Sequence, residues 1–232
     1  MFFDPLYFII VGPAILLTLW AQYKVKSAYK KYSQITASAG ITGAELARRL
    51  LDGNNLSQVA VEPVGGELSD HYDPKAKVLR LSQGIYQGKS IAALSIAAHE
   101  TGHAVQDKTG YIQMRLRAGL VPAANLGSRM APILIIIGFF LIYSLPTIGV
   151  LAMEVGIVLF AAAVLFQLVT LPVEFNASRR ALAMLTNGNY VRPEEYKGAK
   201  SVLTAAALTY VAAALAAITQ LIYFILLSRR SS

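Results

Sequence analysis

Residues 90–107 read SIAALSIAAHETGHAVQD, and this stretch decides how the rest of the chain is interpreted. It contains no proline and consists mainly of alanine, isoleucine and leucine, which predicts a buried helix. His99 and His103 are four positions apart, so a helix places both imidazoles on one face, directed at one point. Glu100 lies one step round the same helix.

This H-E-x-x-H spacing has a chemical meaning. Two neutral imidazoles so placed can each donate a nitrogen to one zinc ion, and Glu100 can take a proton from a water in the open coordination position. The alternative is a pair of structural histidines. The chain has only three histidines, and two of them occur here in register with a glutamate, which favours zinc. Gly102 either admits another backbone segment or the substrate, or serves only in packing.

The composition of the 232 residues is that of a membrane protein, because 55% are hydrophobic and only 15% are charged. No cysteine is present, so a metal must be held by His, Glu or Asp. The net charge of +8 would suggest nucleic acid in a soluble protein. Here it indicates basic loops kept in the cytoplasm, so the expected partner is the lipid bilayer and not a nucleic acid.

Four apolar runs predict about four transmembrane helices: 6–23, 120–145, 147–171 and 202–227. The first is interpreted as an uncleaved anchor with its N-terminus outside, because Lys24 and Lys26 follow it, whereas a signal peptide carries its positive charge before the apolar stretch. The predicted fold is a mainly α, polytopic membrane protein with a small zincin-like α+β metallopeptidase core. Arg229 and Arg230 oppose this topology, since four spans leave them outside.

The charge pattern divides the chain into five segments. The two basic ones are expected in the cytoplasm. The segments are a transmembrane anchor (1–23), a cytoplasmic zinc-peptidase region (24–118), a transmembrane helical hairpin (119–171), a cytoplasmic helix with the third zinc ligand (172–201) and a C-terminal transmembrane helix (202–232).

The zinc-peptidase region should contain further elements before its long helix. Thr42 and Glu45 match a capping box ahead of a short helix that Gly53 closes. Residues 58–61 and 78–82 look like strands, and the turn-rich stretch GGELSDHYDPKAK between them predicts a hairpin. The strand at 78–82 either binds an extended peptide by edge pairing or is plain hairpin structure.

A catalytic zinc usually has three protein ligands, so one is still missing. His71, in DHYDP, and Glu174, in LPVEFNASRRAL, are the candidates. Two histidines plus a glutamate form a standard hydrolytic set, and a carboxylate next to an apolar run is costly unless it is paired or metal-bound. These points favour Glu174. The competing explanation for Glu174 is an ion pair with Arg179 or Arg180.

Three stretches, LSDHYDP, AAHETGHAVQ and LPVEFNASRRAL, resemble the bacterial membrane-bound neutral zinc metallopeptidases, the YugP-like family, and the similarity extends over nearly the whole chain. More distantly, the chain resembles the HtpX-like gluzincins, in which a glutamate in the pattern E-x-x-A-D joins the H-E-x-x-H helix. Here that pattern begins at Glu174 and ends at Ser178, which replaces an aspartate that would orient a zinc histidine. Asp107 or Asn176 could supply this contact instead.

The resemblance implies a zinc metalloendopeptidase in the bacterial plasma membrane, with its active site facing the cytoplasm. His99, His103 and Glu174 would hold Zn²⁺, and Glu100 would be the general base. His71 would then be free to donate to the oxyanion, as Tyr72 or Arg179 also could. The expected substrate is a peptide or membrane protein, and a membrane-protein partner or a homo-oligomer is possible.

Two other functions compete with a peptidase. A non-catalytic, zinc-containing membrane scaffold or chaperone-like protein would have no use for Glu100 as a base. A metal transporter would place its ligands within the spans. Glu154, inside the third apolar run, is a functional candidate or else an interfacial carboxyl.

Overall fold

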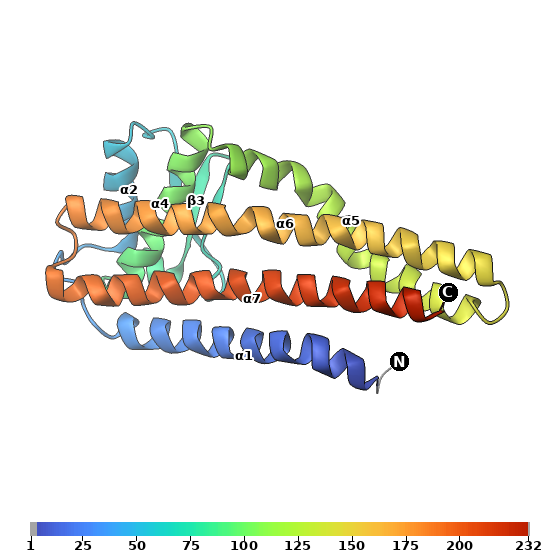
Figure 1. Cartoon of the computed structure of the whole chain (residues 1–232). Helices are drawn as coiled ribbons and strands as arrows, with labels where there is room; N and C mark the ends of the chain where they lie inside the picture. Colours follow the sequence, from blue (N-terminus) through green and yellow to red (C-terminus); the bar gives the residue numbers. More distant parts are fainter. Residues whose placement is uncertain (1–3, 232) are drawn as a thin grey trace. The chain divides into compact units, whose positions relative to one another are not determined.

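The computed structural model describes residues 4–231, and the chain divides into two compact units (Figure 1). The first and last predicted segments also include residues 1–3 and 232, which lie outside the described residues. Unit 1 contains the described residues up to Trp20, Arg115–Leu171, and the described residues from Tyr210. Unit 2 contains Ala21–Met114 and Pro172–Thr209.

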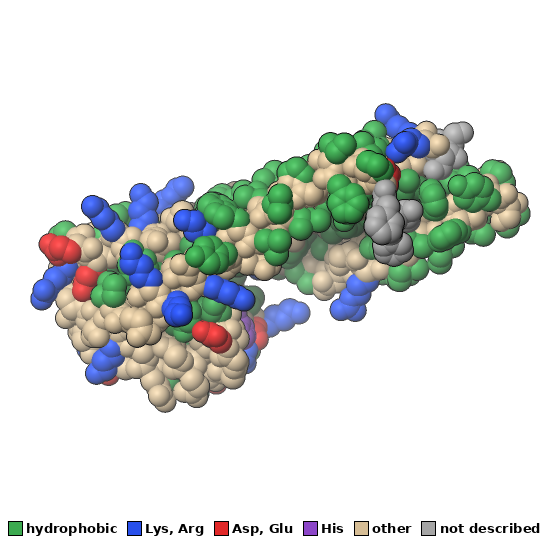
Figure 2. Space-filling model, turned by 90° about the horizontal axis from the view of Figure 1, so that it is seen from below, with side chains coloured by type: hydrophobic (Ala, Val, Ile, Leu, Met, Phe, Trp, Pro, Cys, Tyr) green, Lys and Arg blue, Asp and Glu red, His purple; other side chains and the backbone are tan. Residues whose placement is uncertain are grey.

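The fold is mainly helical, as predicted, and its long helices are α1 (Pro5–Ser33), α5 (Ile112–Leu141), α6 (Pro146–Asn187) and α7 (Pro193–Ser231). Among the described residues, three helices, α5, α6 and α7, are long and apolar enough to cross a membrane. Helix α1 includes the predicted run 6–23, but it is not one of these three helices. Of the four predicted spans, three therefore correspond to helices that could cross a membrane. Figure 2 shows hydrophobic side chains over much of the visible face of unit 1 and charged side chains gathered mainly over unit 2.

Unit 1 is held together by apolar packing among all four long helices. Its core consists of buried side chains from each of them: Val11, Ile135, Met153, Tyr223, Phe224 and Leu227. Helices α5 and α6 approach closely through glycine. A Cβ atom added at Gly127 would lie 2.0 Å from the carbonyl oxygen of Leu159, and one at Gly138 would lie 2.6 Å from that of Gly149. Small residues of this kind let two membrane helices pack backbone to backbone.

The first part of unit 2 contains helix α2 (Gly43–Gly53), whose start and end were predicted correctly. Thr42 is the N-cap, its hydroxyl accepts a hydrogen bond from the Glu45 amide, and the Glu45 carboxylate accepts one from the Thr42 amide. This reciprocal box satisfies two amide groups that the first helical turn leaves without partners. The apolar face of α2, including Leu46 and Leu51, is fully buried.

The sheet of unit 2 differs from the predicted hairpin. It consists of β1 (Ala60–Val64), β2 (His71–Asp73) and β3 (Val78–Ser82), in the order β1-β3-β2. Strands β1 and β3 are parallel, with Ala60 opposite Val78, and the antiparallel partner of β3 is β2. The prediction was wrong because β2 is too short to show an alternating pattern and lies within a stretch that looked like a turn. The connection formed by residues 65–77 is long enough for a parallel pairing.

Strand β3 is therefore the central strand, with a partner on each side. The expectation that its edge could pair with an extended peptide is wrong for this reason. Edge pairing requires unpaired amide and carbonyl groups, and within the described sheet only β1 and β2 have a free side.

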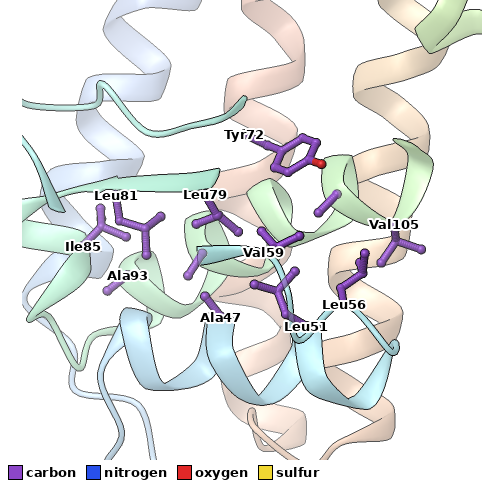
Figure 3. Close-up of a cluster of buried hydrophobic side chains, with 12 residues drawn as sticks. Ala47, Leu51, Leu56, Val59, Tyr72, Leu79, Leu81, Ile85, Ala93 and Val105 are labelled. Carbon is purple, nitrogen blue, oxygen red and sulfur yellow. The ribbon is translucent and has the colours of Figure 1, made fainter. Parts of the chain in front are cut away.

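A hydrophobic core joins α2, the sheet and helix α4 (Ile91–Lys108) (Figure 3). Leu79 and Leu81 of β3 are fully buried, as are Leu51 of α2 and Ala97 of α4. The short helix α3 (Gln83–Tyr86) connects β3 to this core through Ile85. Helix α4 is thus held along its length by neighbours of unit 2, which gives the side chains on its remaining face fixed positions.

Candidate metal centre

Helix α4 carries the H-E-x-x-H stretch, and its bounds agree with the sequence prediction. The Ser90 hydroxyl caps its first turn by accepting a hydrogen bond from the Ala93 amide, and the chain leaves the helix through Gly110 at φ +62°. Most of its residues are buried, and many of these are alanine. Alanine is a strong helix former with a small side chain, so several elements can pack close to the helix axis.

The two histidines and the predicted third ligand lie together. The His99 and His103 rings are edge to face, with centroids 4.8 Å apart. Glu174, on α6, places Oε2 3.3 Å from His99 Nε2 and 3.6 Å from His103 Nε2. One potential ligand atom from each of these three residues lies within 4.8 Å of the others. In the described part of the chain this is the one such group of histidine, aspartate and glutamate side chains, and His71 is not in it.

Glu174 reaches the histidines because α4 and α6 pack unusually closely at Gly102. A Cβ atom added to Gly102 would lie 2.8 Å from the carbonyl oxygen of Ala177 and 3.3 Å from its Cα. Ala177 is about one helical turn beyond Glu174 on α6. The contact of Ala177 with Gly102 therefore also sets where along α4 the Glu174 carboxylate lies. Of the two roles considered for Gly102, close approach of another backbone segment is correct.

Each histidine is held through its second ring nitrogen. The Nδ1 of His103 is 2.9 Å from Oε1 of Gln106, and the Gln106 amide nitrogen donates to Val173 O and to Asn176 Oδ1. Because Gln106 Oε1 can only accept, it binds the Nδ1 hydrogen of neutral His103 and leaves Nε2 as a free donor to a metal.

His99 has a weaker contact of the same kind. Its Nδ1 is 3.2 Å from Ser178 Oγ, so the serine that replaces the aspartate of the gluzincin pattern lies beside the ring. Asp107 does not take this role, because its carboxylate accepts hydrogen bonds from Tyr72 and Lys77. Asn176 acts indirectly, because its Oδ1 accepts a hydrogen bond from Gln106, which in turn contacts His103. The sequence analysis missed Gln106, although its place three residues after His103 on the same helix was a usable signal.

The charges at this point favour a cation. Burial opposes ionisation of Glu174, but the hydrogen bonds of His103 and His99 hold the pKa of its carboxyl well below its usual range. Burial also acts to lower the pKa of His103, yet the Glu174 contact and the charge of Glu100 outweigh it and raise that pKa. A buried carboxylate between two imidazoles therefore fits a bound cation, and two nitrogens with one carboxylate oxygen match a hydrolytic zinc site.

Residues 7–229 match the protein family described as "Putative neutral zinc metallopeptidase". The chain belongs to this family. It is also 51% identical over 214 residues to "Putative membrane protease YugP" of Bacillus subtilis (strain 168), and the match covers 92% of each chain. No solved structure matches it. The resemblance drawn from the three sequence stretches is thereby confirmed, and zinc is the cofactor that the family and the buried His99, His103 and Glu174 group both indicate.

Glu100 follows His99 on α4, and its charge acts on His103. The residue is 8% exposed, and its carboxylate oxygens are not among the buried side-chain atoms without a partner in the described residues, so they reach solvent. A solvent-reaching carboxylate beside two histidines is able to accept a proton from a water molecule. Glu100 also acts on Asp70, a neighbour that the sequence analysis did not predict. Burial raises the pKa of Asp70, opposed by a hydrogen bond from the Ser82 amide, and the charge of Glu100 raises it further.

His71 lies apart from the metal-binding group, on strand β2. Its ring is exposed and its Nδ1 is 2.8 Å from the carbonyl oxygen of Ser69. The next residue, Tyr72, is buried, and its hydroxyl donates to Asp107 on α4. Burial and this hydrogen bond raise the pKa of the Tyr72 phenol. Since neighbouring side chains of a strand point to opposite faces, His71 points away from the side of β2 that contacts α4.

The Gly102 contact yields a prediction for zinc affinity. Gly102→Ala inserts a methyl group into the contact with Ala177, so it should destabilise the fold by about 1–3 kcal/mol and weaken zinc binding by displacing Glu174. Gly119→Ala is the control, because Gly119 is also a helical glycine but has open space around its Cα. Zinc affinity measured by competition with a chelator should fall only in Gly102→Ala. Equal behaviour of the two variants would contradict the packing argument.

Proposed function

We propose that this protein is a membrane-embedded zinc metalloendopeptidase that hydrolyses peptide bonds. Its metal ligands are His99, His103 and Glu174, and Glu100 is the general base. The observation that carries the proposal is the convergence of three potential ligand atoms from α4 and α6, with Glu100 next to His99 on the same helix. A scaffold with a structural zinc would have no use for Glu100 as a base.

The residues divide the chemistry among them. Zinc, when bound, supplies Lewis-acid polarisation of a carbonyl and lowers the pKa of a water molecule. Glu100 removes a proton from the attacking water and passes it to the departing amine, which completes peptide cleavage without a covalent enzyme intermediate. Gln106 and Ser178 keep the His103 and His99 rings oriented, so the ligands are in place before the substrate arrives.

His71 as a donor to the oxyanion stays a prediction. In its favour, β2 is an edge strand of the sheet, and an extended substrate that paired with its free side would place a carbonyl group near this segment. Against it, the His71 ring faces away from the α4 side of the strand. The proposed role therefore requires the ring to turn when substrate binds.

The proposed substrate is a peptide or a membrane protein close to the bilayer of a bacterial plasma membrane. The predicted segments 24–118 and 172–201 support this location, because they carry the metal ligands and lie close to the bounds of unit 2. The predicted segments 119–171 and 202–232 contain the apolar parts of three helices that could span the membrane. The substrate would then be cut next to the membrane surface.

Removal of the metal tests this function directly. We expect the purified full-length protein to contain about one zinc per chain and to cleave a model membrane-protein substrate. Treatment with a chelator should abolish cleavage, and added zinc should restore it. Cleavage that persists after zinc has been removed to below detection would disprove the proposal.

The proposed orientation places the N-terminus outside and both basic segments inside. One contact supports this orientation for one of the two arginines at the end of α7. Arg230 Nη1 lies 3.6 Å from Asp4 Oδ2, and Asp4 also accepts a hydrogen bond from the Tyr223 hydroxyl. A basic side chain paired with an acidic one contributes less to the positive-inside bias, so Arg230 can lie outside.

Thiol labelling tests this orientation, because the chain has no cysteine of its own. Ala76→Cys lies in the exposed turn between β2 and β3, and Ser144→Cys lies in the exposed turn between α5 and α6. In intact cells, a membrane-impermeant thiol reagent should label Ser144→Cys and not Ala76→Cys. The reverse pattern would place the chemistry outside the cell.

A further inference from the structure

Helix α1 has one buried side and one exposed side. Small residues seven positions apart are buried on the first side: Ala14, Ala21 and Ala28. At about 100° per residue, positions seven apart nearly coincide around the helix axis, so the three alanines form one line along the helix. The side opposite to this line is exposed. The described chain therefore leaves a long face of α1 open to its surroundings.

This exposed face of α1 consists of side chains that lie within about 40° of Lys30 around the helix axis. In its first part the side chains are apolar and exposed, and they include Phe8, Leu16 and Leu19. Tyr23 follows on the same face, and Lys26 and Lys30 come last. The exposed face thus changes along the helix from apolar, through one aromatic ring with a hydroxyl group, to basic.

The order of these side chains matches the layers of one half of a bilayer. From Phe8 to Leu19 the helix rises by about 17 Å, which is roughly half of a hydrocarbon core about 30 Å thick. Tyrosine is typical of the boundary between the hydrocarbon core and the headgroups. Lys26 and Lys30 lie about 4.5 and 10.5 Å beyond Tyr23 along the helix, and a lysine side chain can bend to bring its ammonium group to the headgroups.

The two lysines have no anionic partner in their own chain. Residues 5–44 contain no aspartate or glutamate, and the structure gives neither Lys26 nor Lys30 an ion pair within residues 4–231. The acidic side chains that act on this part of α1 act on Tyr29, because burial, and then the charges of Glu67 and Asp70, raise the pKa of its phenol. Lys26 and Lys30 are therefore available to an anion from outside the chain.

We propose that the exposed face of α1 binds the phosphate headgroups of anionic phospholipids through Lys26 and Lys30. The two residues are one helical turn apart, so both ammonium groups can reach the same phosphodiester or two adjacent ones. The apolar part of the same face determines the source of the phosphate. Side chains such as Leu19 favour contact with acyl chains, so the phosphate that meets the lysines belongs to a lipid of the same bilayer. This inference does not depend on the proposed peptidase activity.

Trp20 provides a probe for this lipid, because it is the one tryptophan of the chain, is 46% exposed and lies less than two turns before Lys26. Its fluorescence is quenched by lipids whose acyl chains carry bromine. The full-length protein is reconstituted in vesicles of equal amounts of phosphatidylglycerol and phosphatidylcholine, with bromine on only one of the two lipids at a time. The two degrees of quenching give the preference of the surroundings of Trp20 for the anionic lipid.

We expect a preference of about fivefold for phosphatidylglycerol at low ionic strength, since one lysine near an anionic surface contributes roughly that factor. K26Q/K30Q should reduce the preference to below about twofold, the remainder coming from Lys24 and Lys31 at the sides of the exposed face. K26R/K30R keeps both charges and should keep the preference. The matched control is K75Q/K89Q, which removes the same charge at exposed positions outside α1 and should also keep it.

Three results would overturn the proposal. The first is a wild-type protein without preference for the anionic lipid. The second is a K26Q/K30Q variant that keeps the preference, or a control variant that loses it equally, because either result would assign the effect to the charge of the whole protein. The third is loss of the preference in inorganic phosphate but not in sodium chloride of the same ionic strength, which would show a site for free phosphate.

Discussion

Replacing Glu100 with glutamine is expected to leave zinc bound while the rate of peptide hydrolysis falls by about a hundredfold to ten-thousandfold. Glutamine keeps the size and shape of the side chain but cannot accept a proton from water. Glu100 is not in the group of potential ligand atoms formed by His99, His103 and Glu174, so the metal should remain. The measurement is zinc content by mass spectrometry beside the cleavage rate of the same sample.

A matched substitution separates loss of the base from a general effect of removing a negative charge. Glu67→Gln makes the same chemical change at an exposed site and should retain full activity. If Glu100→Gln cleaves at the wild-type rate, the proposed peptidase mechanism is wrong. If it loses zinc as well as activity, Glu100 supports the metal site and its role as a base is not demonstrated.

The second large effect is expected at Glu174. Glu174→Ala removes the buried carboxylate oxygen that lies 3.3 Å and 3.6 Å from the two histidine nitrogens. Zinc affinity should fall by more than about a hundredfold, because loss of a mere supporting partner of a ligand already costs roughly 10- to 100-fold. Activity should fall as a consequence, and excess zinc should restore much of it. Chelator competition gives the affinity, and a zinc titration of the cleavage rate tests the rescue.

His71→Ala is the control for the rival third ligand. His71 is exposed and outside the metal-binding group, so this variant should keep its zinc. If it also loses rate at full zinc content, the proposed contact with the oxyanion gains support. Loss of zinc in His71→Ala together with retention in Glu174→Ala would show that the ligand assignment is wrong.

The parts of the site that depend on local spacing were predictable from sequence. The four-residue spacing of His99 and His103 and the capping box at Thr42 are properties of single helices, and the structure has both as predicted. The choice of Glu174 required chemical reasoning, because helix spacing says nothing about a residue 75 positions away from His99. The ligand preferences of zinc supplied what the spacing could not.

The strand pairing in the sheet could not be predicted, because it depends on contacts between residues that are distant in sequence. The pairing of β1 with β3 joins residues that are distant in sequence, and β2 has too few residues to reveal an alternating pattern. The assignment of DHYDP as a turn followed from its aspartates and proline. In the structure Asp73 ends β2, residues 74–77 form a turn directly after it, and the amides of Lys75 and Ala76 donate to Asp73 Oδ1. The role of Ser178 depends on its distance from His99, and only the fold determines that distance.

The order of the ligands along the chain has a consequence for biosynthesis. The two histidines leave the ribosome first, and the 75 residues from His99 to Glu174 include all of the apolar hairpin. At ordinary rates of translation this interval lasts roughly 4 to 15 s. During that time the nascent chain has the proposed general base and the histidine pair but not the proposed carboxylate ligand. The catalytic centre is therefore completed only after the hairpin has been synthesised, so a newly made chain cannot cleave its neighbours before its own hairpin has been made.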